Sequence, residues 1–406
     1  IWDACSQMDI PIQKLFKADN RNNYFGHNYD EFCFDGLNSN GELENYSSEM
    51  YSINDILSNN FNEISNNSAD EDVVDVDEYK YKSIIDFPNF LMHIFKIYNK
   101  DVPLNEKYLL STYKEIKDNI APEQFIKTLF FCRTVFDRYI VKTITDNSDN
   151  EDGEKWTLKK PKRYEKSWNY IETYGVNKDS NESSKEQTRV VKALSMLQVT
   201  FRTRIYKNWL YEILKWFNDK QIFKVDYNEY IKKLDDIILN NYKDISPNSR
   251  IDAPVNLTRE NSYSKGLRTP HFIFNFIDYL YWVDSSNDLQ IIENSKIVKD
   301  FNFKYWNSIE HHLAREWADR NNIPRRDNFI DNLGNLCLIS RGANSRLSDR
   351  DVKEKVETFG GGNMGANRQI MYKMTKDDDQ KYSWTEDKIR QHYNELLNLL
   401  ECRIKI

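Results

Sequence analysis

Residues 308 to 345 contain three short segments that together predict the architecture of this part of the chain. The first reads Ser308-Ile309-Glu310-His311-His312-Leu313, and the second reads Asp331-Asn332-Leu333-Gly334-Asn335-Leu336-Cys337-Leu338-Ile339-Ser340. The third, Arg341-Gly342-Ala343-Asn344-Ser345, follows directly. An acid precedes a histidine at the end of one short apolar step, and Asn335 begins a second step. This arrangement predicts a β-hairpin followed by a helix.

The residue types in this stretch favour phosphodiester chemistry. His311 on the first strand could take a proton from water, because imidazole titrates near neutral pH. The carboxylate of Glu310 and the amide of Asn344 could hold one divalent cation, and oxygen ligands favour Mg²⁺ or Mn²⁺ over zinc. Such a cation would stabilise the charge that develops on a phosphodiester and its leaving oxygen. Asn335 is predicted to anchor the hairpin loop and hold His311 in place.

The three parts resemble the HNH, or ββα-metal, nucleases. Many of these read acid-His on the first strand and then N-L-x-x-L-C-x-x-C-N, and the spacing from Asn335 to Asn344 matches. Ser340 and Ala343 stand where many members have two cysteines that bind a structural zinc. That zinc subsite is therefore missing, and we expect helical packing to support the hairpin instead.

A closer resemblance is to the C-terminal part of the GmrSD-type restriction enzymes. Their nuclease domain reads roughly I-E-H-I-x-P-Q, then L-G-N-L-x-L-I, then N-S-x-L-S-N. Here residues 309–315 read I-E-H-H-L-A-R, residues 333–339 read L-G-N-L-C-L-I and residues 344–349 read N-S-R-L-S-D. The departures are His312 for an apolar residue and Ala314-Arg315 for Pro-Gln.

The resemblance implies a metal-dependent DNA endonuclease of the HNH type, in a restriction system or other anti-phage defence. His311 and Asn335 would be the catalytic residues, and Glu310 and Asn344 the metal ligands. The alternative is a non-catalytic nucleic-acid-binding or scaffold module of a defence complex. His312 is either a second metal ligand or, as we favour, an inward-facing strand residue.

Basic residues gather around this motif, although the whole chain has a net charge of −7. Arg341, Arg346, Lys353 and Lys355 are the candidates for contact with DNA phosphates, because counterion release rewards a local basic patch. The two lysines would reach a phosphate if the helix that carries Asn344 continues that far. Solvated surface side chains are the alternative for all four.

Composition limits the class of protein and the cellular location that we expect. The 406 residues are 39% apolar and 30% charged, which is typical of a globular protein with a sizeable core. The five cysteines include no C-x-x-C pair, so we expect a reducing, cytoplasmic location and no zinc knuckle. No signal peptide and no apolar run of about 18 residues is present, so no membrane partner is expected.

Helical periodicity dominates the rest of the chain. It predicts a helix capped by Asp86 that extends to Tyr98, and others over residues 122–141, 186–200, 204–218, 269–283 and 385–402, with a short strand pair over 156–164. The expected fold class is mainly α, a helical domain followed by a C-terminal helical domain with an embedded ββα-metal motif. The expected domains are 1–82 (N-terminal helical segment and acidic linker), 83–265 (helical domain) and 266–406 (HNH nuclease domain).

DNA is the expected partner, and a second partner is expected upstream. The N-terminal domain of the resembling family carries a D-G-Q-Q-R-like signature linked to nucleotide use, which does not occur in this chain. The chain also begins at Ile1 and not at Met. We therefore expect a nucleotide-using domain or subunit that is missing from this sequence.

Overall fold

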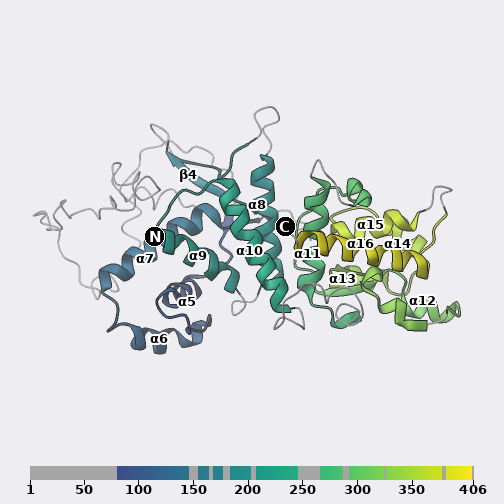
Figure 1. Ribbon diagram of the computed structural model, residues 1–406, viewed down its shortest axis with the longest axis horizontal. Coiled ribbons are helices and arrows are strands. Elements are labelled where there is room, and N and C mark those ends of the chain that lie inside the picture. The colour runs from purple at the N-terminus through teal and green to yellow at the C-terminus, as the bar shows by residue number, and fades with distance from the viewer. Residues whose placement is uncertain are drawn as a thin grey trace, which may run out of the picture.

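The computed structural model describes residues 80–145, 154–163, 168–176, 183–202, 207–245, 266–286, 292–323, 326–376 and 381–404. These residues form a mainly helical molecule, as predicted (Figure 1). Helices α5 to α10 occupy one half of the view in Figure 1, and α11 to α16 occupy the other. The expected N-terminal segment and its acidic linker, residues 1–82, lie almost wholly outside the described residues.

The first half is built mainly from helices. Asp86 caps the first of them as predicted, because its carboxylate accepts a hydrogen bond from the backbone N–H of Asn89 and a proline stands in the first turn. Helices α6 and α10 were not predicted. The helices are α5 (Phe87–Tyr98), α6 (Leu109–Ile116), α7 (Pro122–Tyr139), α8 (Lys185–Thr200), α9 (Asn208–Lys220) and α10 (Tyr227–Ile245).

Two small antiparallel sheets accompany these helices. The first has the order β1 (Lys80–Lys82), β2 (Lys142–Thr145), β3 (Glu154–Thr157), and the second pairs β4 (Lys159–Arg163) with β5 (Trp168–Glu172). Strands were predicted over residues 156–164, but the prediction that they pair with each other is wrong. A local pattern shows that a segment is extended, whereas its partner is decided by contacts distant in sequence.

The second half surrounds one hairpin with helices. Strand β6 (Ser308–His311) pairs antiparallel with β7 (Leu336–Ile339), so that Glu310 lies opposite Cys337. Helix α13 follows β7 directly. Helix α12 lies between the strands and was not predicted. The helices are α11 (His271–Ser285), α12 (Arg315–Arg320), α13 (Arg341–Leu347), α14 (Val352–Phe359), α15 (Ala366–Thr375) and α16 (Glu386–Ile404).

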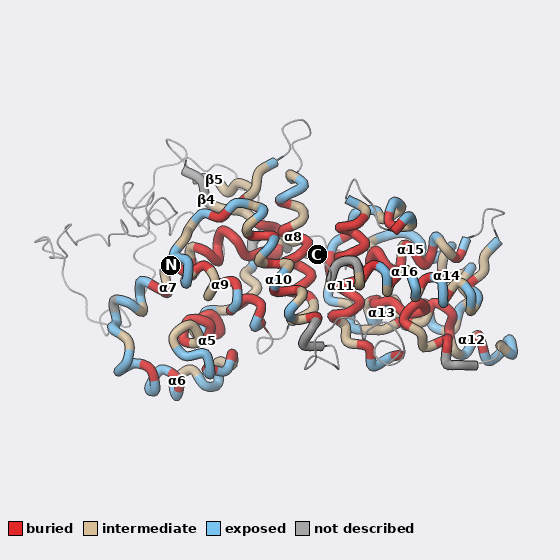
Figure 2. Tube along the Cα trace, in the orientation of Figure 1, coloured by how far each residue is buried: buried red, intermediate tan, exposed pale blue. Residues whose placement is uncertain are grey.

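Helix α11 is the packing centre of the molecule (Figure 2). Every residue from Phe272 to Asp284 is buried, as expected for a helix that is apolar on most of its surface. It contacts α8 from the first half and α15, α16 and β7 from the second. One apolar cluster therefore includes residues of both halves, from Ile85 to Leu400. The predicted domain boundary at residue 266 stays a prediction.

A second apolar cluster supports the hairpin. It joins Cys337 and Ile339 of β7 to side chains from the surrounding helices, such as Met371 and Ile389. All four residues of β7 are buried. Packing of this kind supports the hairpin. Among the described residues, none of the helices combines the length and apolar character that crossing a membrane requires.

Candidate functional site

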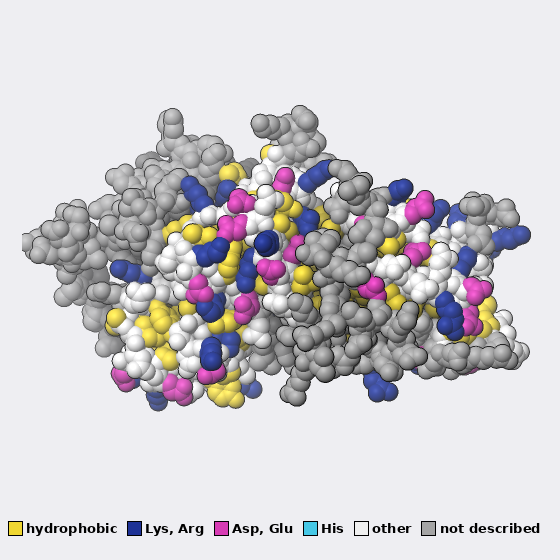
Figure 3. Space-filling view, viewed as in Figure 1, with side chains coloured by type: hydrophobic (Ala, Val, Ile, Leu, Met, Phe, Trp, Pro, Cys, Tyr) yellow, Lys and Arg dark blue, Asp and Glu magenta, His cyan; other side chains and the backbone are white. Residues whose placement is uncertain are grey.

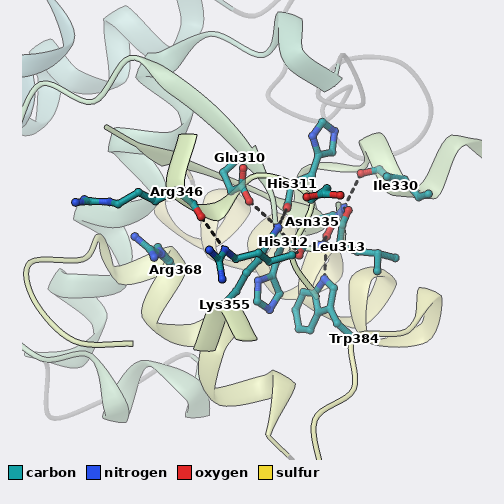
Figure 4. A network of polar contacts seen from close by, with 12 residues as sticks. Glu310, His311, His312, Leu313, Ile330, Asn335, Arg346, Lys355, Arg368 and Trp384 are labelled. Carbon is teal, nitrogen blue, oxygen red and sulfur yellow. Dashed lines mark hydrogen bonds and ion pairs between the residues drawn. The ribbon is translucent and has the colours of Figure 1, made fainter. Parts of the chain in front are cut away.

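Asn335 fastens the end of β6 to the start of β7 (Figure 4). Its side chain is fully buried. Oδ1 accepts hydrogen bonds from the Leu313 backbone N–H at 2.8 Å and from Trp384 Nε1 at 2.9 Å. Nδ2 donates to the backbone carbonyls of Leu313 at 3.1 Å and Ile330 at 2.7 Å. The amide thus makes the four hydrogen bonds expected of it, and its predicted role in holding His311 for catalysis stays a prediction.

Gly334, next to this anchor, lets α16 approach the hairpin closely. A Cβ atom at Gly334 would lie 2.3 Å from the backbone carbonyl oxygen of Ile389, so a larger residue would clash with the helix. Nδ1 of the buried His392 lies 2.7 Å from the Gly334 carbonyl oxygen and donates to it. The glycine of the L-G-N-L segment is therefore required by helix packing.

Glu310 forms a buried ion pair with Lys355 of α14. Lys355 Nζ lies 2.6 Å from Glu310 Oε1, and it also donates to the backbone carbonyls of His311 at 2.7 Å and His312 at 3.1 Å. All three ammonium donors are therefore used on the end of β6. Burial raises the pKa of Glu310, while the ammonium of Lys355 acts in the opposite direction.

The position of Lys355 corrects the prediction that it contacts a DNA phosphate. Its side chain is fully buried, and Figure 4 shows it extending beneath Glu310 toward the end of the strand. The helix that carries Asn344 also does not continue, because it ends at Leu347 and the φ of 42° at Ser348 breaks the helical path. A new helix, α14, begins at Val352 and turns Lys355 inward.

His311 lies in a different set of contacts. Its Nε2 is 2.9 Å from Asp331 Oδ1, and Arg315 Nε donates to the same oxygen at 2.8 Å. Arg315 Nη2 also lies 2.6 Å from this oxygen and forms an ion pair with it. Burial lowers the pKa of His311, although the hydrogen bond to Asp331 opposes this effect. Burial would raise the pKa of Asp331, but hydrogen bonds from Arg315 and His311 outweigh it and lower that pKa. The imidazole is therefore neutral and held by an ionised carboxylate at neutral pH.

His312, the first residue after β6, packs inward into the core. Its Nε2 lies 2.6 Å from Thr375 Oγ1, and its ring stacks on Tyr372 with centroids 5.2 Å apart. Trp384 meets the other side of the ring, edge to face. Burial lowers the pKa of His312 well below its ordinary value. These contacts leave His312 neutral inside the core, in line with the structural alternative.

The remaining predicted site residues lie on α13 and α14. Asn344 is half-buried on α13, a helix that packs against β6. Within the described part of the chain, its side chain makes no hydrogen bond to Glu310 or His311. Arg341, Arg346 and Lys353 are exposed. Ser340, at the first missing cysteine position, caps α13 by accepting a hydrogen bond from the Ala343 backbone N–H at 3.1 Å.

The structure thus brings together two pairs that the sequence did not connect. Glu310 meets Lys355, and His311 meets Asp331, which in turn holds Arg315. The sequence pattern indicated no site role for Asp331 and did not predict that Lys355 is buried. The one available signal was Arg315, which departs from the glutamine of the family pattern. Among the described residues, no group of three His, Cys, Asp or Glu side chains is arranged to bind a metal.

The comparison with known families bears on this part of the chain. Residues 255–399 match the family described as GmrSD restriction endonucleases, C-terminal domain. This segment belongs to the GmrSD C-terminal domain family. The GmrSD-type domain includes both strands of the hairpin and every predicted site residue. Among curated proteins and solved structures, none matches the chain. The match associates the chain with restriction endonucleases and hence with DNA as substrate.

Proposed function

We propose that this chain is a metal-dependent DNA endonuclease of the HNH type that acts in a restriction or anti-phage system. The observation that carries the proposal is an oriented, neutral imidazole at the end of a buried hairpin strand. Asp331 holds His311 there by a hydrogen bond, and Glu310 directly precedes it in the sequence. These residues lie within the segment that matches the GmrSD C-terminal domain. A neutral imidazole can accept a proton from water, so His311 would be the general base.

The proposed metal ligands are Glu310 and Asn344. The ion pair with Lys355 uses Oε1 of Glu310, which leaves Oε2 for a cation. The side chain of Asn344 adds an amide oxygen from the helix that packs against β6. This oxygen donor set fits Mg²⁺ or Mn²⁺ better than zinc. When bound, the cation would stabilise negative charge on the phosphodiester.

Strand geometry limits where the substrate can lie. Successive strand residues point to opposite faces, and Glu310 and His311 contact different elements. His311 is the last residue of β6. A phosphodiester that contacts both residues would therefore lie across the end of this strand, and not over one face of the hairpin.

Individual basic side chains would contact the DNA backbone. Basic and acidic side chains are interspersed on the face shown in Figure 3, so phosphate contacts there would come from separate residues. Arg341 and Arg346 on α13 and Lys353 on α14 are exposed and stay proposed for this role. The nucleotide-using upstream domain or subunit also stays a prediction.

A plasmid-cleavage assay tests the proposal. The purified chain is incubated with supercoiled DNA, with Mg²⁺, Mn²⁺ or EDTA, beside the His311→Ala variant. We expect metal-dependent nicking or linearisation by the wild type, and a loss of at least about 100-fold in rate for the variant, as for removal of a general base. Lys215→Met, an exposed change on α9, is the matched control and should cleave like the wild type.

The outcomes separate the proposal from its alternative. Equal background nicking by the wild type and His311→Ala would overturn the nuclease assignment. Retained DNA binding in a gel-shift assay, together with that result, would favour a non-catalytic binding module. Cleavage that persists unchanged in EDTA would overturn the metal assignment alone.

A further inference from the structure

A series of polar contacts next to the hairpin was not predicted from the sequence. It runs from His311 through Asp331 to Arg315, on three separate elements: β6, the 3-10 helix η8 (Arg326–Asp331) and the first residue of α12. Asp331 Oδ1 accepts hydrogen bonds from His311 Nε2 and Arg315 Nε, and it forms an ion pair with Arg315 Nη2. A single carboxylate oxygen therefore connects His311 to an arginine.

These contacts determine which ring nitrogen of His311 carries the proton and which has the lone pair. An ionised carboxylate has only acceptor atoms, so the Nε2 that faces Asp331 must carry the proton. In a neutral imidazole the lone pair then lies on Nδ1. Arg315 supplies one hydrogen bond and an ion pair to the same oxygen, which stabilises the ionised form of Asp331.

The backbone around Asp331 is shaped to hold it there. Gly266 has a φ of 57°, in the left-handed region that favours glycine, and it is buried. A Cβ atom at Gly266 would lie 3.2 Å from Asp331 Cβ. The glycine thus leaves room for the acid on one side, while Arg315 and His311 hold it on the other. The Asp331 side chain is only 18% exposed.

Arg315, which replaces the glutamine of the resembling family pattern, is part of the same set of contacts. Where the resembling pattern has Pro-Gln, this chain has Ala314-Arg315. An arginine at this position would be a surplus charge beside His311 unless an acid neutralised it. Asp331 is that acid, and the two residues form an ion pair with His311 as the third member.

We propose that Asp331 is a positioning residue that fixes the tautomer and orientation of His311, and that Arg315 holds Asp331 in place for this task. The inference rests on the proposed nuclease function for its effect on rate, but the geometry of His311 can be tested without activity. Neither Asp331 nor Arg315 would touch the substrate.

Two variants test the role of Asp331. Asp331→Ala removes the acceptor, whereas Asp331→Asn keeps an acceptor oxygen for the imidazole N–H. For Asp331→Ala we expect a fall of about 10- to 100-fold in kcat with little change in KM, as is typical when a supporting partner is lost. Asp331→Asn should recover part of this loss. Asp349→Asn is the matched control, because Asp349 pairs with Arg320 on the surface and not with a histidine.

A spectroscopic readout separates this inference from the proposed function. Nitrogen-15 NMR of labelled histidine reports which ring nitrogen carries the proton. We expect His311 to be protonated at Nε2 in the wild type and in Asp331→Asn, and to become a mixture of tautomers in Asp331→Ala. If the wild type does not cleave DNA but shows this pattern, the proposed function fails while the positioning of His311 stands. If the wild type cleaves and Asp331→Ala changes neither kcat nor the tautomer, the inference is overturned.

Discussion

At the residue scale, the ion pair of Glu310 and Lys355 shows how a charged pair can be placed inside a core. Taking two charges out of water costs several kcal/mol per ion, and close contact offsets that cost only when the remaining donors are satisfied. Lys355 meets this condition, because two backbone carbonyls occupy its other donors. Its ammonium therefore fastens α14 to the end of β6 and holds the Glu310 carboxylate in one position.

A substitution at Lys355 tests this role. Lys355→Met keeps the length of the side chain but leaves Glu310 buried without its cation. We expect the free energy of unfolding in urea to fall by about 3–5 kcal/mol, the usual loss when one partner of a buried pair is removed. Lys215→Met breaks an exposed pair on α9 and should cost about 0.5 kcal/mol or less. Equal effects of the two variants would contradict a structural role for the buried pair.

At the element scale, Asp278 of α11 links three elements that hold the hairpin. Its carboxyl group accepts a hydrogen bond from the Asn367 backbone N–H at 2.7 Å, in the first turn of α15. The side chain of Asn367 donates to the Leu336 backbone carbonyl at 3.0 Å, at the start of β7. Gly365 is needed for this approach, since a Cβ atom there would lie 2.3 Å from Asp278 Oδ2.

The buried carboxyl group of Asp278 predicts a pH dependence of stability. Burial raises its pKa from 3.8 to about 7, although the N–H of Asn367 opposes the shift. The folded state binds the proton more tightly than the unfolded chain does. Stability from this group is therefore complete below about pH 3.8 and is lost as the pH rises toward 7.

Asp278→Asn checks that prediction, because an amide does not titrate and keeps the acceptor for Asn367. Relative to this variant, we expect the wild type to lose a few kcal/mol of unfolding free energy between pH 4 and pH 7, at about 1.4 kcal/mol for each unit of pKa difference. Urea unfolding at several pH values measures the difference. Asp118→Asn, at an exposed acid, serves as control. A constant difference between the wild type and Asp278→Asn would refute the shifted pKa.

At the scale of the whole molecule, Lys192 and Asp300 join the two halves. Lys192 Nζ on α8 lies 2.7 Å from Asp300 Oδ1 and donates to the Phe301 backbone carbonyl. Trp282 Nε1 of α11 donates to the same carboxylate oxygen at 3.0 Å. The lysine side chain is 5% exposed and the aspartate side chain 68% exposed, so the pair is buried on one side only.

This asymmetry predicts unequal effects of the two possible truncations. Asp300→Ala removes the carboxylate from a buried ammonium, which keeps only the Phe301 carbonyl, and leaves the Trp282 N–H without its acceptor. We expect this to cost about 1–3 kcal/mol. Lys192→Met leaves an aspartate that water can solvate, and should cost less. Urea unfolding of both variants, followed by tryptophan fluorescence, compares them. A larger loss for Lys192→Met than for Asp300→Ala would contradict this account of the contact.

Local sequence patterns were enough to predict the helical character of the molecule and the position of the hairpin. Apolar residues three and four apart require one buried face, so α5, α7, α8 and α11 could be placed closely without knowing what they pack against. The L-G-N-L segment and its spacing to Glu310 and Asn344 likewise located the candidate site, because a hairpin and the helix after it are local structures.

The side chains that contact one another at this site could not be predicted in the same way, because they come from elements distant in sequence. Asp331 and Lys355 lie 20 and 44 residues from His311, and their contacts depend on how η8 and α14 fold back onto β6. Helix α13 ends before Ser348, and the new helix α14 places Lys355 inside the core. The sequence had predicted an exposed lysine at this position. The packing of elements distant in sequence determines which residue pairs with a buried charge. Local periodicity therefore cannot predict that residue.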